Sequence, residues 1–237
     1  MTRTASRQRF TLGVAVAALL YAGSSILAAT SALDALSPKD ASSGLRTALS
    51  QGIDIAVAQL GKPDGFLKDP KVAIPLPSAL QKAEHALRFL GLDKDAESLK
   101  ATMNHAAEAA VAEAKPIFKT ALQRMTLADA KAILTGGDDA GTQYFRRATS
   151  EQLTSKFKPI VARETAKLKL AAQYDDYAGR AAQMGLIKTE DANINDYVTN
   201  KALDGLFSRI ADEERAIRKD PLGQASSIIK KVFGATQ

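Results

Sequence analysis

The side chains able to carry out chemistry in this sequence are carboxylates, hydroxyls and two histidines, because none of its 237 residues is cysteine. Thiol nucleophiles, thiolate metal sites, structural disulfides and the acylated cysteine of a lipoprotein are therefore excluded. The sequence also has no G-x-S-x-G elbow, phosphate-binding P-loop, dinucleotide fingerprint or zinc-protease helix motif. An enzymatic mechanism would have to depend on acidic side chains, and no cofactor is expected.

Three glutamates are the candidate catalytic residues. Helical projection places Glu213 and Glu214 on the two flanks of an apolar helix face, and Glu108 lies in an earlier, Ala-rich helix. Half-burial raises the pKa of a carboxyl group, as a general acid requires. A hydrolase acting on envelope material would need Glu108 within about 5 to 10 Å of Glu213 or Glu214. The other interpretation of the two flanking glutamates is a salt bridge to a neighbouring helix.

Two patterns resemble metal sites, and neither is complete. His105 and Glu108 are three residues apart on one helix, but helical di-iron sites use the order Glu-x-x-His and use it twice. The segment 191–195 matches the first three ligand positions of a calcium loop. Its sixth position, however, is Asp196 in place of glycine, and its twelfth is Ala202 in place of glutamate. No metal site is predicted.

The elements that must position these residues are helices, because Ala, Leu, Lys, Gln and Glu outnumber the β-branched alternation that strands need. We expect an all-α fold, a single irregular multi-helix bundle. A helix start is expected at Thr149 and a break at Pro159, and the Ala-rich helix is expected to be central. The longer predicted helices cover residues 42–60, 79–90, 93–115, 174–184, 194–219 and 223–233.

A proline-rich segment, residues 62–77, interrupts the helical pattern and is named the strap. It contains four prolines and a turn signal at Asp64-Gly65. Its apolar side chains are too many for a solvated linker, so we expect it to lie across the helical core. Loops of this length are often functional, and the alternative is a purely structural strap stiffened by proline. The apolar residues are Phe66, Leu67, Val72, Ile74 and Leu76.

The N-terminus has the features of a cleaved signal peptide. Three arginines precede an apolar run from Phe10 to Tyr21, which is shorter than the roughly 20 residues of a spanning helix. We expect residues 1–30 to be a signal peptide of the general secretory route, cut near Ala28 to Ala32, and residues 31–237 to be a single helical domain in the periplasm. An uncleaved membrane anchor is the alternative.

The charge pattern does not favour nucleic acid as a partner. Residues 1–30 contain three arginines and no acid, so removing them lowers the formal net charge from +6 to +3. The remaining acidic and basic residues are interleaved, without a run of five like charges or a series of stacking aromatics.

A series of short strings, in this order, is similar to an exported proteobacterial family catalogued as a domain of unknown function, DUF4197. The resemblance covers nearly all of the chain after residue 40. Its strings include Gly44-Leu45-Arg46, Asp64-Gly65-Phe66, Ile74-Pro75-Leu76-Pro77, Met103-Asn104, Ala106-Ala107-Glu108, Tyr144-Phe145, Tyr197-Val198-Thr199, Lys201-Ala202-Leu203-Asp204-Gly205-Leu206-Phe207, Glu213-Glu214, Ile217-Arg218 and Lys231-Val232-Phe233-Gly234.

The resemblance implies a single helical domain in the periplasm or envelope of a Gram-negative bacterium, and it brings no established activity. The chain departs from the family at His105, where Arg is usual, and at Gly141, where Ala is common. Residues within or beside the strings are candidates for binding a ligand or partner, or for a buried structural network. They are Arg46, Asp64, Phe66, Asn104, Lys201, Asp204 and Arg218.

The leading functional hypothesis is a non-enzymatic periplasmic protein that binds a partner protein, a lipid or another apolar ligand. The first alternative is the carboxylate-dependent hydrolase described above. The second is a peripheral membrane protein attached through its C-terminal amphipathic helix. That helix carries Ile228, Ile229, Val232 and Phe233 beside Lys230 and Lys231.

Overall fold

The computed structural model describes residues 37–82, 89, 91, 93–185, 187–223 and 226–234. These residues form helices and no strand, so the predicted all-α fold is confirmed. The expected signal peptide and most of the predicted helix 79–90 lie outside the described residues. The helices are α2 (Pro38–Leu60), α3 (Ser78–Lys82), α5 (Asp93–Ala112), α6 (Lys115–Arg124), α7 (Leu127–Leu134), α8 (Ala140–Thr165), α9 (Lys169–Gln183), the 3-10 helix η1 (Thr189–Asp191), α10 (Ile194–Lys219) and α11 (Ser227–Gly234).

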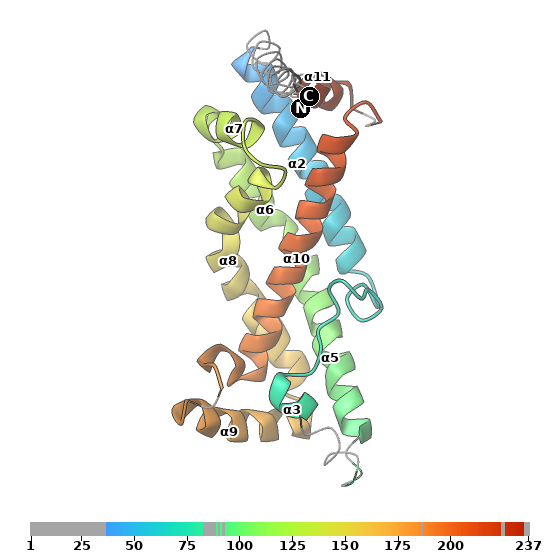
Figure 1. Cartoon of the computed structure of the whole chain (residues 1–237), viewed down its shortest axis with the longest axis vertical. Coiled ribbons are helices and arrows are strands. Elements are labelled where there is room, and N and C mark those ends of the chain that lie inside the picture. The colour runs from blue at the N-terminus through green and yellow to red at the C-terminus, as the bar shows by residue number, and fades with distance from the viewer. Residues whose placement is uncertain are drawn as a thin grey trace, which may run out of the picture.

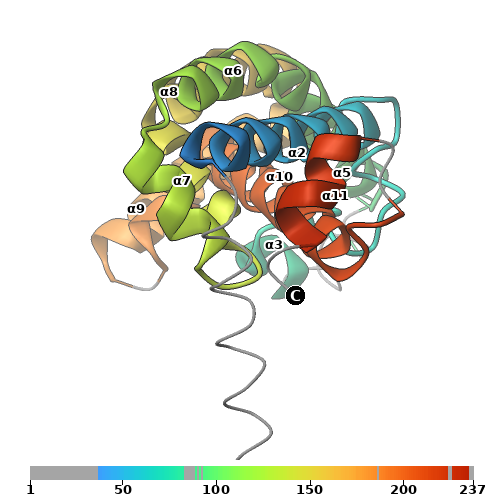
Figure 2. The ribbon, with the colours of Figure 1, turned by 90° about the horizontal axis from the view of Figure 1, so that it is seen from above.

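The helices form an elongated bundle with α10 at its centre. Helix α10 packs against α2, α5 and α8, which surround it when the molecule is viewed from above (Figures 1 and 2). The Ala-rich helix α5, which was expected to be central, covers one side instead. Helix α10 has this place because buried residues with small side chains, such as Ala202, Gly205 and Ala211, let several neighbours approach it.

Helix α8 is one continuous helix where the sequence predicted an interruption. It contains Pro159, which is exposed on its surface. Thr149, predicted to start a new helix, is buried inside α8, and its hydroxyl donates to the Phe145 carbonyl oxygen at 2.7 Å. Pro116, in contrast, stands in the first turn of α6, a position that proline tolerates because the first N–H groups of a helix have no partner.

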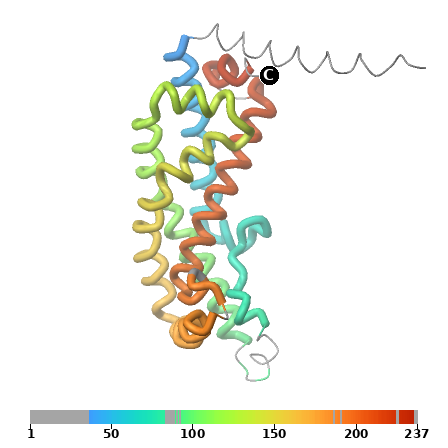
Figure 3. The backbone as a smooth tube through the Cα atoms, turned by 60° about the vertical axis from the view of Figure 1, so that its left-hand side comes forward, coloured from blue at the N-terminus to red at the C-terminus, as the bar shows by residue number. Residues whose placement is uncertain are grey.

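The C-terminal helix α11 lies at the same end of the bundle as the start of α2 (Figure 3). Ile229, Val232 and Phe233 are buried, and α11 packs against α2. A Cβ atom on Gly44 would stand 2.4 Å from Val232 Cγ2, so only glycine allows this approach. The apolar face that the membrane-attachment alternative requires is therefore covered by α2. No helix in the described ranges is long and apolar enough to cross a bilayer.

Candidate functional site

Two polar side chains of α5 hold the strap through its backbone. The Glu108 carboxylate accepts hydrogen bonds from the backbone N–H groups of Phe66 at 3.0 Å, Asp64 at 3.2 Å and Leu67 at 3.4 Å. Asn104 accepts from the Ile74 N–H at 2.8 Å and donates to the Ile74 carbonyl oxygen at 2.9 Å. Both side chains are buried. Buried backbone N–H and C=O groups need hydrogen-bond partners, and these two side chains supply them where the strap has no helical or sheet hydrogen bonds.

Helix α10 holds the other side of the strap (Figure 3). The Phe66 ring packs on Gly205, and the Tyr197 hydroxyl donates to the Pro75 carbonyl oxygen at 3.1 Å. Arg209 forms an ion pair with Asp69 of the strap. Tyr197 is buried by these contacts, with only 7% of its surface exposed.

Asp64 forms a mainly exposed cluster at the first turn of the strap. Its carboxylate lies 2.7 Å from Lys68 Nζ and 3.5 Å from His105 Nε2. Hydrogen bonds from Lys68 and then from His105 hold the pKa of Asp64 below its usual value. The Asp64 backbone has a φ of 62°, a left-handed conformation that aspartate tolerates in turns. These contacts stabilise the turn.

Glu214 and Arg218 fix the start of α8. The Glu214 carboxylate accepts from the N–H groups of Gly141 at 2.9 Å and Thr142 at 2.8 Å. A carboxylate is favourable at a helix N-terminus because the first N–H groups are unpaired there. Arg218 donates to Glu214 at 2.9 Å and to the Ile133 carbonyl oxygen at 2.9 Å. This pair, with side-chain exposures of 14% and 3%, is a buried structural network.

Glu213 and Arg46 lie at two other places, outside the Glu108 and Glu214 networks. Glu213 is half-buried against Gly52 of α2, and burial raises its pKa while the charge of Arg209 opposes the rise. The Arg46 guanidinium donates to the Met125 carbonyl oxygen at the end of α6. Arg46 also lines an open hollow of about 600 Å³ between α2 and α6.

The three candidate catalytic glutamates therefore contact three different elements. Glu108 binds the strap, Glu213 faces α2, and Glu214 binds the start of α8. Glu108 accepts from Phe66, whose ring packs on Gly205, so Glu108 lies near the level of Gly205 along α10. Glu214 follows Gly205 by nine residues, which is about 13 Å along the helix axis. Glu108 and Glu214 each bind backbone N–H groups of a different segment and are not paired with each other, and a pair of Glu108 with Glu213 stays a prediction.

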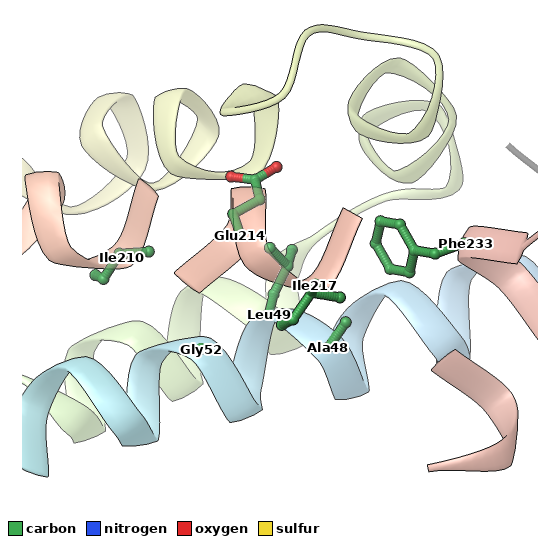
Figure 4. A pocket seen from close by; sticks show the side chains of 7 residues that line it. All are labelled: Ala48, Leu49, Gly52, Ile210, Glu214, Ile217 and Phe233. Carbon is green, nitrogen blue, oxygen red and sulfur yellow. The ribbon is translucent and has the colours of Figure 1, made fainter. Parts of the chain in front are cut away.

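The apolar cavity beside Glu214 is too small for a lipid. It has a volume of about 10 Å³ and lies among α2, α10 and α11, lined by Ala48, Leu49, Gly52, Ile210, Glu214, Ile217 and Phe233 (Figure 4). A single water needs about 10 to 15 Å³. This cavity therefore gives no support to the apolar ligand that the sequence suggested.

A larger and more polar hollow lies between α8 and α10 and is named the α8–α10 groove. It has a volume of about 380 Å³. The two helices run side by side (Figure 1), and η1 contributes one residue. The groove is lined by Arg146, Ser150, Thr154, Asp191, Tyr197, Asn200, Lys201, Leu203, Asp204 and Phe207.

Charged groups of both signs line this groove. Arg146 Nη1 lies 3.2 Å from Asp204 Oδ1, and the Arg146 guanidinium stands 4.6 Å from the centre of the Phe207 ring. Lys201 Nζ lies 5.8 Å from the centre of the Tyr197 ring. No group of three or more His, Asp or Glu side chains within the described ranges is arranged to hold a metal ion.

Of the predicted ligand-binding residues, Lys201 and Asp204 meet in this groove. Asn104, Asp64 and Phe66 are joined with Glu108 at the strap, Arg218 is beside Glu214, and Arg46 lies apart. The prediction missed the contribution of α8. Arg146, Ser150 and Thr154 recur every four residues, which indicates one helix face, but that spacing does not reveal which helix the face meets.

Comparison with known proteins gives a family and no characterised relative. No curated protein and no solved structure matches the chain. The family model described as "Protein of unknown function (DUF4197)" matches residues 35–234, a range that includes the strap, both glutamate networks and the α8–α10 groove. The chain therefore belongs to the DUF4197 family.

Proposed function

We propose that this protein is a non-enzymatic binding protein of the bacterial periplasm, and that its ligand is a small polar molecule held in the α8–α10 groove. One observation carries the proposal. Lys201 and Asp204 line a hollow of about 380 Å³, whereas most of the other candidate polar residues hold the backbone or each other. A volume of this size falls within the usual range of about 300 to 1,000 Å³ for small-molecule sites.

The chemistry of the lining favours a polar ligand. Ser150, Thr154 and Asn200 offer hydroxyl and amide groups that both donate and accept hydrogen bonds. The Arg146–Asp204 ion pair is largely exposed, with side-chain exposures of 44% and 62%, so a ligand can replace it at little cost. A lipid chain would leave these groups without partners.

The proposed periplasmic location is supported by the arginine-containing N-terminus and the apolar run after it. N-terminal sequencing of the protein isolated from a Gram-negative host tests it. We expect the mature chain to begin within residues 29–33. Full-length chain in the membrane fraction would contradict this location.

Chemical-shift mapping tests the binding site. The aqueous low-molecular-weight fraction of a Gram-negative envelope extract is added to ¹⁵N-labelled mature protein, and the lipid fraction is added in parallel. We expect the aqueous fraction to shift amide signals within residues 146–154 and 197–207. Thr154→Met, which fills the groove, should abolish these shifts. Ser155→Met, at an exposed position that does not line the groove, should preserve them.

Four outcomes would overturn the proposal. Shifts caused only by the lipid fraction would exclude a polar ligand. Shifts located elsewhere, or retained in Thr154→Met, would exclude the groove as the site. Absence of shifts with both fractions would exclude a small-molecule binding role.

A further inference from the structure

Two of the four charged side chains of the α8–α10 groove already form an ion pair, and two do not. Arg146 pairs with Asp204. In the part of the chain that the structure describes, Lys201 and Asp191 take part in no ion pair. Lys201 Nζ lies over the Tyr197 ring, and Asp191 accepts a hydrogen bond from Tyr174 through its backbone carbonyl oxygen. The groove therefore keeps one cation and one anion available to a ligand.

The volume of the groove and the backbone spacing of Asp191 and Lys201 limit the size of that ligand. Asp191 ends η1, and α10 begins three residues later at Ile194. Lys201 follows Ile194 by seven residues, which is about 10 Å along the helix axis. An extended peptide spans roughly 3.3 to 3.6 Å per residue, so three residues cover about 10 Å. The backbone spacing and the volume of about 380 Å³ both suit a molecule of up to about this length.

The sign of the charges selects the chemical class. Because Arg146 and Asp204 pair with each other, a purely anionic ligand would be repelled by Asp191 and a purely cationic one by Lys201. A neutral sugar would leave Lys201 and Asp191 without a counter-charge. A molecule with an anionic and a cationic end satisfies both, while Ser150, Thr154 and Asn200 can bond to amide groups between its ends.

We propose that the groove binds a short peptide of two or three residues with both termini free, its carboxylate on Lys201 and its ammonium on Asp191. This assignment rests on the proposed function, because it names the ligand class of the same groove. Each terminal contact is a hydrogen bond between charged groups, which contributes more than a bond between neutral groups.

Calorimetric titration with trialanine and its end-blocked forms tests the assignment. We expect trialanine to bind, and N-acetyl-trialanine and trialanine amide each to bind at least about tenfold more weakly. In Lys201→Met, trialanine and its amide should bind equally. In Asp191→Asn, trialanine and its N-acetyl form should bind equally. Lys156→Met is the matched control, because this lysine of α8 pairs with Glu113 and does not line the groove. It should bind the three peptides in the wild-type order of affinity.

The possible failures are distinguishable. If trialanine does not bind but the aqueous extract shifts the groove signals, the peptide assignment is wrong and the proposed function stands. If all three peptides bind equally to the wild type, or if Lys201→Met keeps the preference for the free carboxylate, the assignment is likewise overturned. If neither peptide nor extract reaches the groove, both proposals fail. Thermal melts followed by circular dichroism establish that each variant is folded.

Discussion

The ring of Phe66 occupies the space that a side chain on residue 205 would need. A Cβ atom on Gly205 would stand 2.7 Å from Phe66 Cε1 and 3.3 Å from Val72 Cβ. Phe66 is fully buried, and its N–H donates to Glu108. The glycine in the centre of α10 therefore lets the strap lie directly against that helix, between it and α5.

Gly205→Ala should destabilise the protein. Alanine improves helix propensity by about 1 kcal/mol, but overpacking of a filled core costs about 1 to 3 kcal/mol. Because Phe66 is held on both sides, we expect the clash to outweigh the gain and the free energy of unfolding in urea to fall. Gly179→Ala in α9 is the control, since a Cβ there meets no atom within 4 Å. It should be neutral or stabilising. A stabilising Gly205→Ala would contradict the tight contact.

Glu214 and Arg218 should be strongly coupled. Removing one partner takes the opposite charge away from the other, which keeps only its neutral hydrogen bonds in a buried place, so Glu214→Gln and Arg218→Met should each lower the free energy of unfolding by about 3 kcal/mol. The double variant should lose less than the sum of the two, with a coupling of about 1 kcal/mol or more. Equilibrium unfolding of the four proteins measures this cycle. Additive losses would show that the pair does not act as a unit.

Asn104 and Glu108 should protect different amides of the strap. Asn104→Ala removes the acceptor for the Ile74 N–H, and Glu108→Gln weakens the acceptor for the Phe66 N–H. We expect about 1 to 3 kcal/mol of lost stability for each, because buried groups lose their partners. Hydrogen exchange should accelerate at Ile74 in the first variant and at Phe66 in the second. His105→Ala, on the exposed side of the same helix, should leave both amides protected.

Glu213 should make the protein less stable as pH rises. Burial raises its pKa, so the folded protein keeps this proton to higher pH than the unfolded chain does. Its contribution to the free energy of unfolding therefore falls as pH rises above the ordinary value of 4.5. The free energy of unfolding of Glu213→Gln, measured in urea, should gain relative to that of the wild type as the pH rises from about 4 to about 7. A gain that shrinks with pH would contradict the burial of this carboxyl.

Asp129 should show the opposite sign. The Thr126 side chain and then its backbone N–H donate to this carboxylate and lower its pKa below the ordinary value of 3.8. Its stabilisation is present above that value and is lost as pH falls through the folded pKa. The deficit of Asp129→Asn relative to the wild type should therefore shrink as the solution becomes acidic, in the same unfolding experiment. A deficit independent of pH would contradict the hydrogen bonds from Thr126 to this carboxylate.

Helix α10 could be predicted from the sequence because its signals are local. Its periodic apolar residues begin at Ile194, and Asp220 before a proline ends it; the observed bounds are Ile194–Lys219. Helix α8 was divided in the prediction because Thr149 resembles a helix start and Pro159 a break. Both are tolerated here: the Thr149 hydroxyl bonds within the helix, and Pro159 faces solvent.

The sites depended on partners that local patterns do not reveal. Asn104 and Glu108 were identified as candidate site residues, but their partners are backbone N–H groups of a loop. Lys201 and Asp204 were identified as candidates, but Arg146 reaches Asp204 from 58 residues away. Periodicity indicates which residues share a face, and only the packing of helices decides what that face meets.

Native mass spectrometry of the mature protein isolated from the periplasm tests the central claim most directly. The account predicts that the wild type carries a small polar molecule, identified after dissociation, and that Thr154→Met carries none. A lipid on the wild type, the same molecule retained by Thr154→Met, or no bound molecule on either protein would contradict the assignment of the α8–α10 groove as the binding site.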